Sequence, residues 1–360
     1  MNTTAILFLS GIISFSANAQ DVTPFISFNG YFKSFQDGFF RQIEFQPIKS
    51  FKAGDDVVAY IDFKGNLRVY DGTNPVDLAN VNLEYEVSDN LLVWKIANTL
   101  NLWDDGELQT LTYFADQYEI RDSLVVYQHT RSNSLMVYYN SENYELYSTT
   151  GSIGMPDFVG ENVVVFRDNG NYYKVFWQGE IYELDVWHNP IKFSGGTDIV
   201  AFNDPIMGTF AIFENGQFLD VEEFHMSSYQ AGRGFIAYTN LNGELFYYGN
   251  GEKIMLTNFA PNFWEVKDDV ILWEENGITS VYIQGETIEL GRYTPKDYLI
   301  KNDVVAYRNL TGGVNAILNG KVKTLTSQQN AQYSIYGSSV LLELFNRSFI
   351  LYRDGREYRD

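Results

Sequence analysis

The chain repeats one short pattern about every 35 residues, and this repeat constrains the fold more than any other feature of the sequence. Most copies contain an apolar run of four residues that ends in an aromatic side chain, as in the run from Val57 to Tyr60. The intervals between the last residues of successive runs are 34, 33, 39, 36, 36, 35, 34 and 36. The nine runs end at Tyr60, Trp94, Tyr127, Phe166, Phe202, Tyr238, Trp273, Tyr307 and, in a degenerate copy, Glu343. Such self-similarity is typical of architectures that stack one supersecondary unit.

A tight-turn signal recurs with the same period. Several copies contain Asp-Gly or Asn-Gly, the pairs that tolerate the positive φ angles of a two-residue hairpin. The predicted turn residues are Gly38, Gly72, Gly106, Asn143, Gly179, Gly216, Gly251, Gly285, Gly320 and Gly355. Because two independent markers share one period, the repeat is not a chance coincidence.

Each repeat divides into four short strands. In residues 85–113 we expect strands over 85–88, 91–95, 100–103 and 108–112, with a turn at Asp104-Asp105-Gly106. The second of these is apolar throughout, as expected for a strand that is covered on both faces. The third alternates apolar and polar residues, which predicts one packed face. With no sustained helical period or capped helical start, the pattern predicts an all-β protein, a β-propeller of four-stranded blades.

The number of blades follows less directly from the sequence. There are nine apolar runs and ten turn signals, because residues 25–46 resemble a repeat that lacks its first strand. We expect eight to ten blades, with nine preferred if the two ends of the chain share one blade. No linker divides the array, so residues 20–360 are predicted to form a single propeller domain.

The first 19 residues resemble a secretory signal peptide. The stretch from Ala5 to Phe15 is almost wholly apolar, and Ala17-Asn18-Ala19 fits a small-x-small cleavage site. The alternative is a transmembrane anchor, but the apolar run is short for a bilayer core of roughly 30 Å. We therefore expect an exported protein that is periplasmic or extracellular, with no integral membrane segment after cleavage.

Composition excludes several classes of function. The formal charge is -21, with 25 basic and 46 acidic residues. Nucleic acid is therefore not an expected partner, since its binding needs clustered positive charge. The chain has no cysteine, so it has no disulfides, thiolate metal ligands or cysteine nucleophile.

Beyond the repeat, the sequence resembles TolB-like and WD-repeat-like bacterial β-propellers. The resemblance rests on the apolar second strand, the turn glycine and a Leu-Thr pair that closes several fourth strands. These pairs are Leu111-Thr112, Leu256-Thr257 and Leu325-Thr326. The Trp-Asp pair of WD repeats occurs only as Trp103-Asp104, and the Ser-Pro-Asp-Gly of TolB-like repeats is absent. The resemblance implies a scaffold for binding and supplies no catalytic residues, because fold does not determine function.

Propeller geometry predicts two different faces. Calling the strands of a blade a, b, c and d, the a–b and c–d turns share one face and the b–c and d–a loops share the other. Acidic residues recur in the a–b turns, and we interpret them as turn formers; they are Asp55, Asp89, Asp122, Asp268 and Asp303. Calcium is an alternative, but no loop has the D-x-D-x-D-G pattern, so no cofactor or metal is predicted.

The b–c and d–a loops vary in length and sequence and carry all three histidines. Trp187-His188 and Glu222-Glu223 with His225 fall in equivalent d–a loops of adjacent blades, which suggests a shared site. The candidate ligand-binding residues on this face are His129, Arg131, Trp187, His188, Glu222, Glu223, His225, Arg292 and Tyr293. Of these, Arg131, Arg292 and Tyr293 could pair with an acidic ligand such as a uronate.

The sequence is compatible with three functions. The first is a module that binds a protein or polysaccharide partner through the b–c and d–a loops. The second is a polysaccharide lyase or glycosidase that uses imidazole and carboxylate groups of the same loops. The third is a structural envelope protein without a ligand site. An enzyme requires a histidine within hydrogen-bond reach of a carboxylate in a cleft. A binding module predicts a concave or aromatic-rich patch on the same face, and a structural protein predicts neither.

Overall fold

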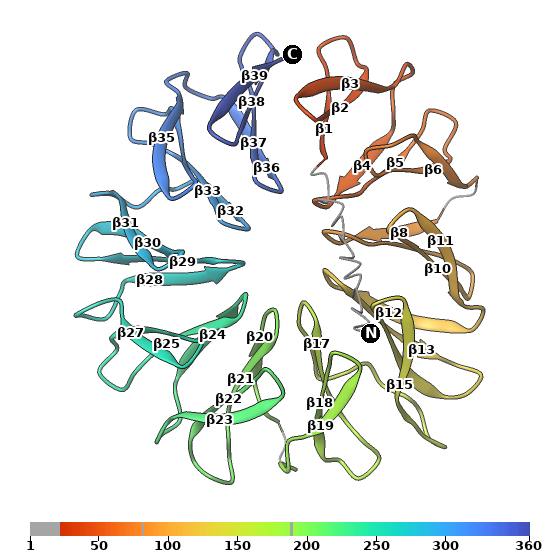
Figure 1. Cartoon of the computed structure of the whole chain (residues 1–360), viewed down its shortest axis with the longest axis vertical. Coiled ribbons are helices and arrows are strands. Elements are labelled where there is room, and N and C mark those ends of the chain that lie inside the picture. The colour runs from red at the N-terminus through yellow and green to blue at the C-terminus, as the bar shows by residue number, and fades with distance from the viewer. Residues whose placement is uncertain (1–21, 81–82, 188–189) are drawn as a thin grey trace, which may run out of the picture.

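The computed structural model describes residues 22–80, 83–187 and 190–360. They form a closed ring of ten antiparallel sheets, each sheet being one blade (Figure 1). Nine sheets have four strands and the first has three. The described residues contain no helix. The predicted all-β propeller is therefore confirmed, and the number of blades is ten.

Sequence order and spatial order agree within every blade. Blades 1 to 3 contain β1 (Thr23–Ile26), β2 (Phe32–Gln36), β3 (Phe39–Glu44); β4 (Ser50–Ala53), β5 (Val58–Ile61), β6 (Leu67–Tyr70), β7 (Val76–Ala79); β8 (Glu84–Val87), β9 (Leu92–Ile96), β10 (Thr99–Asp104) and β11 (Glu107–Thr112). Blades 4 to 6 contain β12 (Ala115–Ile120), β13 (Leu124–His129), β14 (Ser134–Tyr139), β15 (Glu142–Ser148); β16 (Phe158–Val159), β17 (Val163–Arg167), β18 (Tyr173–Trp177), β19 (Glu180–Glu183); β20 (Phe193–Gly195), β21 (Ile199–Asn203), β22 (Phe210–Glu214) and β23 (Gln217–Glu222).

The remaining four blades follow the same order. Blades 7 and 8 contain β24 (Ser228–Gly232), β25 (Phe235–Thr239), β26 (Leu245–Gly249), β27 (Glu252–Met255); β28 (Phe263–Lys267), β29 (Val270–Glu275), β30 (Ile278–Ile283) and β31 (Glu286–Gly291). Blades 9 and 10 contain β32 (Tyr298–Lys301), β33 (Val304–Arg308), β34 (Val314–Leu318), β35 (Lys321–Thr326); β36 (Gln332–Tyr336), β37 (Ser339–Glu343), β38 (Phe349–Arg353) and β39 (Arg356–Arg359).

The first strand of a four-stranded blade lies nearest the centre of the ring and the last lies at the rim (Figure 1). The b strands are buried on both faces: the four residues from Val163 to Phe166 are completely inaccessible to solvent. The d strands are more exposed: of the four residues of β35 before Leu325, three are exposed and one is partly buried. Burial of one Val or Leu contributes roughly 1.5–3 kcal/mol, so contact between neighbouring blades is what stabilises the ring.

The c–d turns have the backbone geometry that the glycine signal predicts. At Asn215 and Gly216 the φ angles are 49° and 77°, the left-handed conformation that both positions of a two-residue hairpin require. In blade 4 the turn is made by Asn140 and Ser141, with φ angles of 50° and 64°. Asn143, the residue predicted to turn there, instead lies within β15.

Blade 1 explains why the preferred count of nine falls one short. The ends of the chain were expected to share a blade, but each forms its own. The strands of blade 1 correspond to b, c and d, as the incomplete repeat predicts. In the described residues no strand pairs with the inner edge of β1. Pro24 occupies the position of Ala59, which pairs with strand a in blade 2, and proline lacks the N–H that such pairing uses.

Side chains, rather than a shared sheet, close the ring between blades 10 and 1. The rings of Phe25 and Phe349 pack with their centroids 4.5 Å apart. Lys33 of β2 forms an ion pair of 2.6 Å with Asp360. Nearer the axis, the N–H of Gly337 in blade 10 donates to Asp55 of blade 2 at 3.0 Å.

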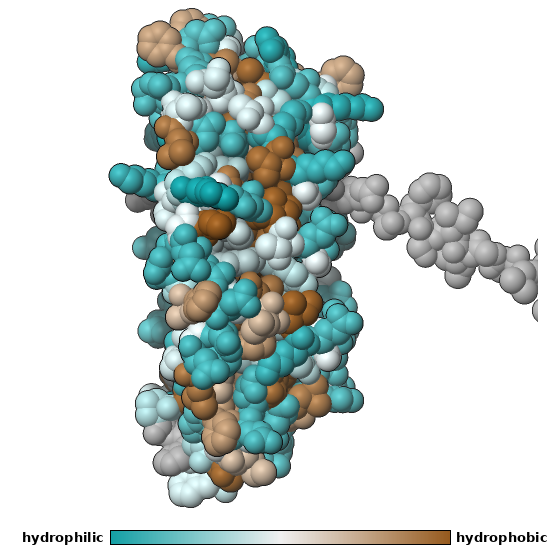
Figure 2. Space-filling model, turned by 90° about the vertical axis from the view of Figure 1, so that its left-hand side faces the viewer, coloured by the Kyte–Doolittle hydropathy of each residue, from teal (hydrophilic) through white to brown (hydrophobic). Residues whose placement is uncertain are grey.

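Seen from the side, the ring is a flattened disc whose visible rim mixes hydrophilic side chains with small groups of hydrophobic ones (Figure 2). No helix in the described part of the chain is long and apolar enough to cross a bilayer. The predicted signal peptide, residues 1–19, lies outside the described residues.

Candidate functional site

Hydrogen bonds confirm that the b–c and d–a loops meet on one face, here called the variable-loop face. The N–H of Thr130, in a b–c loop, donates to the carbonyl of Phe114 in the preceding d–a loop at 2.8 Å. On the opposite face, here called the turn face, Gln284 of a c–d turn donates to Asp303 of the next a–b turn at 2.9 Å.

His129 and Arg131 belong to one small surface cluster. The Nδ1 atom of His129 lies 2.6 Å from the hydroxyl of Ser132, and the imidazole packs edge-on against Phe114. The guanidinium of Arg131 lies over the same phenyl ring, 5.2 Å from its centroid. Among the described residues, the contacts of these two side chains are with Ser132 and Phe114, and none is with a carboxylate.

The structure describes only part of the predicted site around His225. Its Nε2 atom lies 2.8 Å from the carbonyl oxygen of Asp204, and the imidazole borders a pocket of about 410 Å³ beside Asn203 and Tyr229. Trp187 is 66% exposed. His188 lies outside the described residues, so the proposed pairing of Trp187-His188 with His225 stays a prediction.

The carboxylate of Glu222 makes its polar contacts with side chains of the next blade. Its carboxylate accepts the hydroxyl hydrogen of Tyr238 and forms an ion pair with Lys253. Burial and this hydrogen bond to Glu222 raise the pKa of Tyr238. Glu223, next along the chain, is exposed. The described contacts therefore do not join either carboxylate to His225.

Arg292 and Tyr293, which are neighbours in the sequence, lie in different environments. Arg292 is exposed, whereas Tyr293 packs partly buried against the core between blades 8 and 9. The backbone carbonyl of Tyr293 accepts a hydrogen bond of 2.7 Å from the hydroxyl of Thr279. Tyr293 is thus a structural residue at this position.

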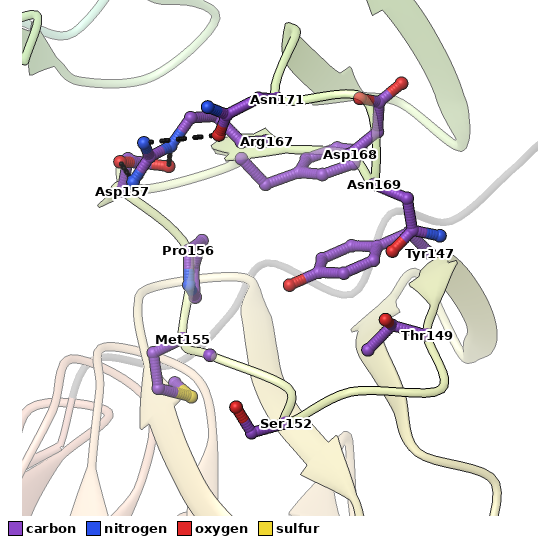
Figure 3. Close-up of a pocket in the computed structure, with 12 residues that line it drawn as sticks. Tyr147, Thr149, Ser152, Met155, Pro156, Asp157, Arg167, Asp168, Asn169 and Asn171 are labelled. Carbon is purple, nitrogen blue, oxygen red and sulfur yellow. Dashed lines mark hydrogen bonds and ion pairs between the residues drawn. The ribbon is translucent and has the colours of Figure 1, made fainter. Parts of the chain in front are cut away.

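Sequence reasoning missed a pocket on the variable-loop face between blades 4 and 5, here called the blade 4–5 pocket. It has a volume of about 270 Å³ (Figure 3). One wall is the d–a loop over residues 149–157, one of the two longest in the chain, and another is the b–c loop that follows β17. The interval of 39 residues between Tyr127 and Phe166, the longest in the repeat, was the sequence signal for this insertion.

An arginine–carboxylate pair fixes the d–a loop of the blade 4–5 pocket. Arg167 at the end of β17 donates through Nε and Nη2 to the two oxygens of Asp157, at 3.0 and 2.9 Å. The hydrogen bond to Asp157 raises the pKa of Arg167. Such bidentate pairs are stronger and more directional than single contacts. The loop before blade 5 is thereby tied to the strand of the same blade.

Asp168 also has a structural task. Its Oδ1 atom accepts the N–H groups of Gly170 and Tyr172, and its Oδ2 atom lies 3.3 Å from Nζ of Lys174. Burial acts to raise the pKa of Asp168, but the hydrogen bonds from Tyr172, Lys174 and Gly170 outweigh it and lower the pKa. The carboxylate therefore holds the b–c loop in an Asx-type turn.

A second missed feature lies at the centre of the turn face, where the a–b turns converge. We call it the axial charge cluster: Asp55, Asp89, Asp122, Glu161, Arg233, Asp268, Asp269, Lys301 and Asn302. Arg233 of blade 7 reaches Asp89 of blade 3 at 3.5 Å and Asp122 of blade 4 at 3.6 Å. Lys301 of blade 9 forms an ion pair of 2.9 Å with Asp89 and another with Asp55.

Two carboxylates of the axial charge cluster accept hydrogen bonds from the a–b turns of other blades. Asp55 accepts hydrogen bonds from Gly337 at 3.0 Å and from the amide of Asn302 at 2.8 Å. Asp268 accepts the N–H of Asn302 at 2.8 Å. The interpretation of Asp55 and Asp268 as local turn formers is therefore incomplete, because these carboxylates connect blades. Two basic residues among acidic ones, Arg233 and Lys301, were the available sequence signal.

Negative charge outnumbers positive charge in the axial charge cluster. Burial, with the neighbouring charges of Asp89 and Glu161, raises the pKa of Asp122 to about 7. Burial also raises the pKa of Glu161 and that of Asp269. Within the described residues no group of three or more carboxylates or histidines has the arrangement of a metal site.

The ten blades, the turn face and the variable-loop face together define a β-propeller. The chain belongs to the family described as the 10-bladed beta propeller domain, whose sequence model matches residues 16–358. The comparison with curated proteins gave no significant match.

Solved structures similar to the chain are distant. The computationally designed Ika8 protein is 15% identical, with a TM-score of 0.36, over 80% of this chain and 96% of that one. Prp20p from Saccharomyces cerevisiae, described with its binding to Gsp1p and histones, is 10% identical, with a TM-score of 0.33, over 71% and 89%. The CRINKLY WD40 ectodomain of the Arabidopsis thaliana receptor kinase ACR4 is 9% identical, with a TM-score of 0.31, over 76% and 95%.

Proposed function

We propose that this protein is an exported binding module that docks a protein partner on its variable-loop face. The observation that carries the proposal is the distribution of exposed apolar side chains. Loops of this face carry Phe28, Phe45, Phe63, Tyr113, Tyr172, Trp187, Ile206, Met207, Phe224, Leu241, Phe259, Leu310 and Phe345, all strongly exposed. In the described residues no a–b or c–d turn carries an exposed large apolar side chain.

Exposed apolar side chains in this number favour a protein partner over a polysaccharide. Single exposed hydrophobic residues are normal, but a set gathered on one face indicates an interaction surface. Aromatic side chains contribute most to protein interfaces when a partner desolvates them. Phe345 is 89% exposed and Phe28 is 68% exposed, on the b–c loops of the adjacent blades 10 and 1. Both rings therefore have a large exposed area that a partner could bury.

Two alternatives have less support. A lyase or glycosidase needs a histidine paired with a carboxylate, and the described contacts of His129 and His225 are with Ser132, Phe114 and the backbone of Asp204. A purely structural envelope protein gives no reason to expose aromatic side chains on one face. The TolB-like resemblance is compatible with a periplasmic binding role.

The proposal is tested with the mature chain, residues 20–360, in a screen against envelope proteins and glycans. A triple variant carries Phe28→Ser, Phe63→Ser and Phe345→Ser on the variable-loop face. The matched control carries Phe39→Ser, Leu108→Ser and Phe218→Ser, which removes exposed apolar side chains from outer strands. We expect a protein ligand whose affinity falls at least about tenfold in the first variant and stays unchanged in the control.

Two results would refute the docking proposal: equal losses in both variants, or a ligand whose affinity neither variant changes. Export is tested separately, by expressing the full chain in a bacterium and sequencing the N-terminus of the secreted product. We expect a mature terminus at Gln20, and retention of the intact chain in the cytoplasm would contradict export.

A further inference from the structure

We propose that the blade 4–5 pocket binds one neutral sugar residue. This site goes beyond the docking of a protein, because it is a small polar pocket rather than an exposed apolar surface. It is formed by two loops of the variable-loop face and combines compensated charges, a small volume, hydroxyl groups and one aromatic ring.

The charges that line the pocket are already compensated. Both oxygens of Asp157 accept from Arg167, and Asp168 is bound by two backbone N–H groups and Lys174. An anionic ligand would therefore compete with Asp157 for Arg167, and a cationic ligand would compete with Arg167 for Asp157. A neutral ligand enters without breaking either ion pair, which is why a uronate is less suitable here.

Uncommitted hydrogen-bonding groups face the same space. Figure 3 shows the hydroxyl end of Tyr147 directed into the pocket, with Ser152 on one side and Arg167 with Asn171 on the other. Among the described residues, the hydroxyl groups of Tyr147 and Ser152 have no hydrogen-bond partner. Each can donate and accept, as the hydroxyl groups of a sugar also can. This set favours a polyhydroxylated ligand over an apolar one.

An aromatic ring supplies the contact for the less polar side of such a ligand. The ring of Tyr147 lies parallel to that of Phe166, with the centroids 6.0 Å apart. Phe166 is completely buried, so Tyr147 is held by a fixed part of the core. Tyrosine combines an apolar ring with a polar tip, which suits a ligand that has C–H and O–H groups side by side.

Size and rigidity narrow the choice to one sugar ring. Pockets for drug-sized ligands enclose about 300–1,000 Å³, and this pocket is just below that range. The Asp157–Arg167 pair fixes one loop, and the amide of Asn169 donates to the carbonyl of Ser148 at 2.7 Å to fix the other. A preorganised pocket loses less entropy when a ligand binds.

The test is a titration of the mature chain with a panel of neutral monosaccharides: glucose, galactose, mannose, xylose and N-acetylglucosamine. Binding is followed by saturation-transfer NMR and by isothermal calorimetry, with glucuronate as the acidic comparison. We expect at least one neutral sugar to bind more tightly than glucuronate. Tyr147→Ala should weaken that sugar at least about tenfold, and Ser152→Ala should weaken it severalfold.

The matched control is Tyr172→Ala, which removes an exposed tyrosine of the same b–c loop that does not line the pocket. It should leave the sugar affinity unchanged. Ser152 is exposed, so Ser152→Ala keeps the test valid even if Tyr147→Ala unfolds blade 4. No binding of any neutral sugar, tighter binding of glucuronate, or equal losses in the Tyr147 and Tyr172 variants would overturn the proposal. Because the apolar loop variants do not alter this pocket, failure of the sugar test leaves the docking test independent.

Discussion

Backbone approaches backbone where the first strands end near the axis. A Cβ at Gly196 would overlap the carbonyl oxygen of Gly232, and one at Gly232 would overlap the carbonyl oxygen of Asp268. These glycines recur at an interval of 36 residues, so they are part of the repeat. They are required here by the closeness of neighbouring blades rather than by a positive φ angle.

Gly196→Ala should therefore destabilise the protein by about 2–4 kcal/mol, because the obstructing atom is backbone and cannot rotate away. Urea unfolding measures the change. Gly154→Ala is the control, since nothing lies within 4 Å of a Cβ at that position and its φ angle is not positive. A loss of less than about 0.5 kcal/mol in Gly196→Ala would show that the blades can separate at this contact without cost.

Asp122 gives stability a pH dependence. Its pKa is about 7 in the folded protein, above the ordinary value of 3.8, so the folded state holds the proton more tightly than the unfolded state. The stabilisation from this proton is complete below about pH 4 and is lost as the pH rises through 7. Glu161 and Asp269, whose pKa values are also raised, act in the same direction.

Asp122→Asn should remove part of this dependence. We expect the variant to be more stable than the wild type at pH 8, by about 1–3 kcal/mol, and to differ little at low pH. Urea unfolding at pH 5 and at pH 8 measures the difference. Asp105→Asn, in an exposed c–d turn, removes a charge away from the cluster and should leave the change between the two pH values intact. A variant less stable at pH 8 than the wild type would mean that the attraction between Asp122 and Arg233 outweighs the burial of Asp122.

At the residue scale, the sequence predicted which face carries the candidate side chains but not which side chains meet there. His129, Arg131 and His225 do lie on the variable-loop face, because loop position follows from the strand order. Which side chains meet there could not be predicted, since Glu222 bonds Tyr238 of the next blade and Arg167 bonds an inserted loop. Contacts between blades depend on the relative placement of sheets, and the repeat does not encode that at side-chain resolution.

At the scale of strands and blades, periodicity was more informative. The predicted strands over 85–88, 91–95, 100–103 and 108–112 match β8 to β11 within one residue at each end. Turn glycines and buried apolar runs determine such strands locally, so the strands of one blade can be predicted from the sequence of that blade alone. The number of blades depends on whether the two ends of the chain share a blade. Local sequence patterns carry no information on that contact.

Pro24 allows the incomplete blade to be tested. Because the inner edge of β1 has no partner strand in the described residues, Pro24→Ala should change stability by less than about 1 kcal/mol. The opposite substitution at the equivalent position of blade 2, Ala59→Pro, removes the N–H that faces β4. It should lower the free energy of unfolding by about 3 kcal/mol or more. Thermal unfolding of both variants provides the comparison. Equal losses would mean that the edge of β1 is paired.

The ring as a whole joins its ends without exchanging a strand. Each of blades 3 to 9 packs against two four-stranded neighbours, whereas blade 10 packs through one core against blade 1, which has only three strands. That core is formed by Phe25, Phe35, Leu341, Phe349 and Leu351. Beyond that core, the ring of Phe35 packs against Tyr358 of blade 10 with the centroids 4.6 Å apart, and Lys33 forms its ion pair with Asp360. The hydrogen bond from Gly337 joins blade 10 to Asp55 of blade 2. We therefore expect this joint to be the first place at which the ring opens.

Phe349→Ala tests this expectation at the scale of the molecule. Removing a buried phenyl ring costs about 3–5 kcal/mol wherever it lies, so global stability alone does not identify the joint. Phe176→Ala, which empties a fully buried position between blades 4 and 5, is the matched control. Hydrogen exchange distinguishes the two, because local opening exposes the amides of the affected blades before global unfolding does.

In Phe349→Ala we expect faster exchange in β1, β2, β37 and β38, with the distant blades still protected. In Phe176→Ala the blades on both sides still hold the ring closed, so exchange should rise less and near that position only. Equal rises in both variants would indicate that the ring has no preferred opening point and that side-chain packing closes it as firmly as any other pair of blades.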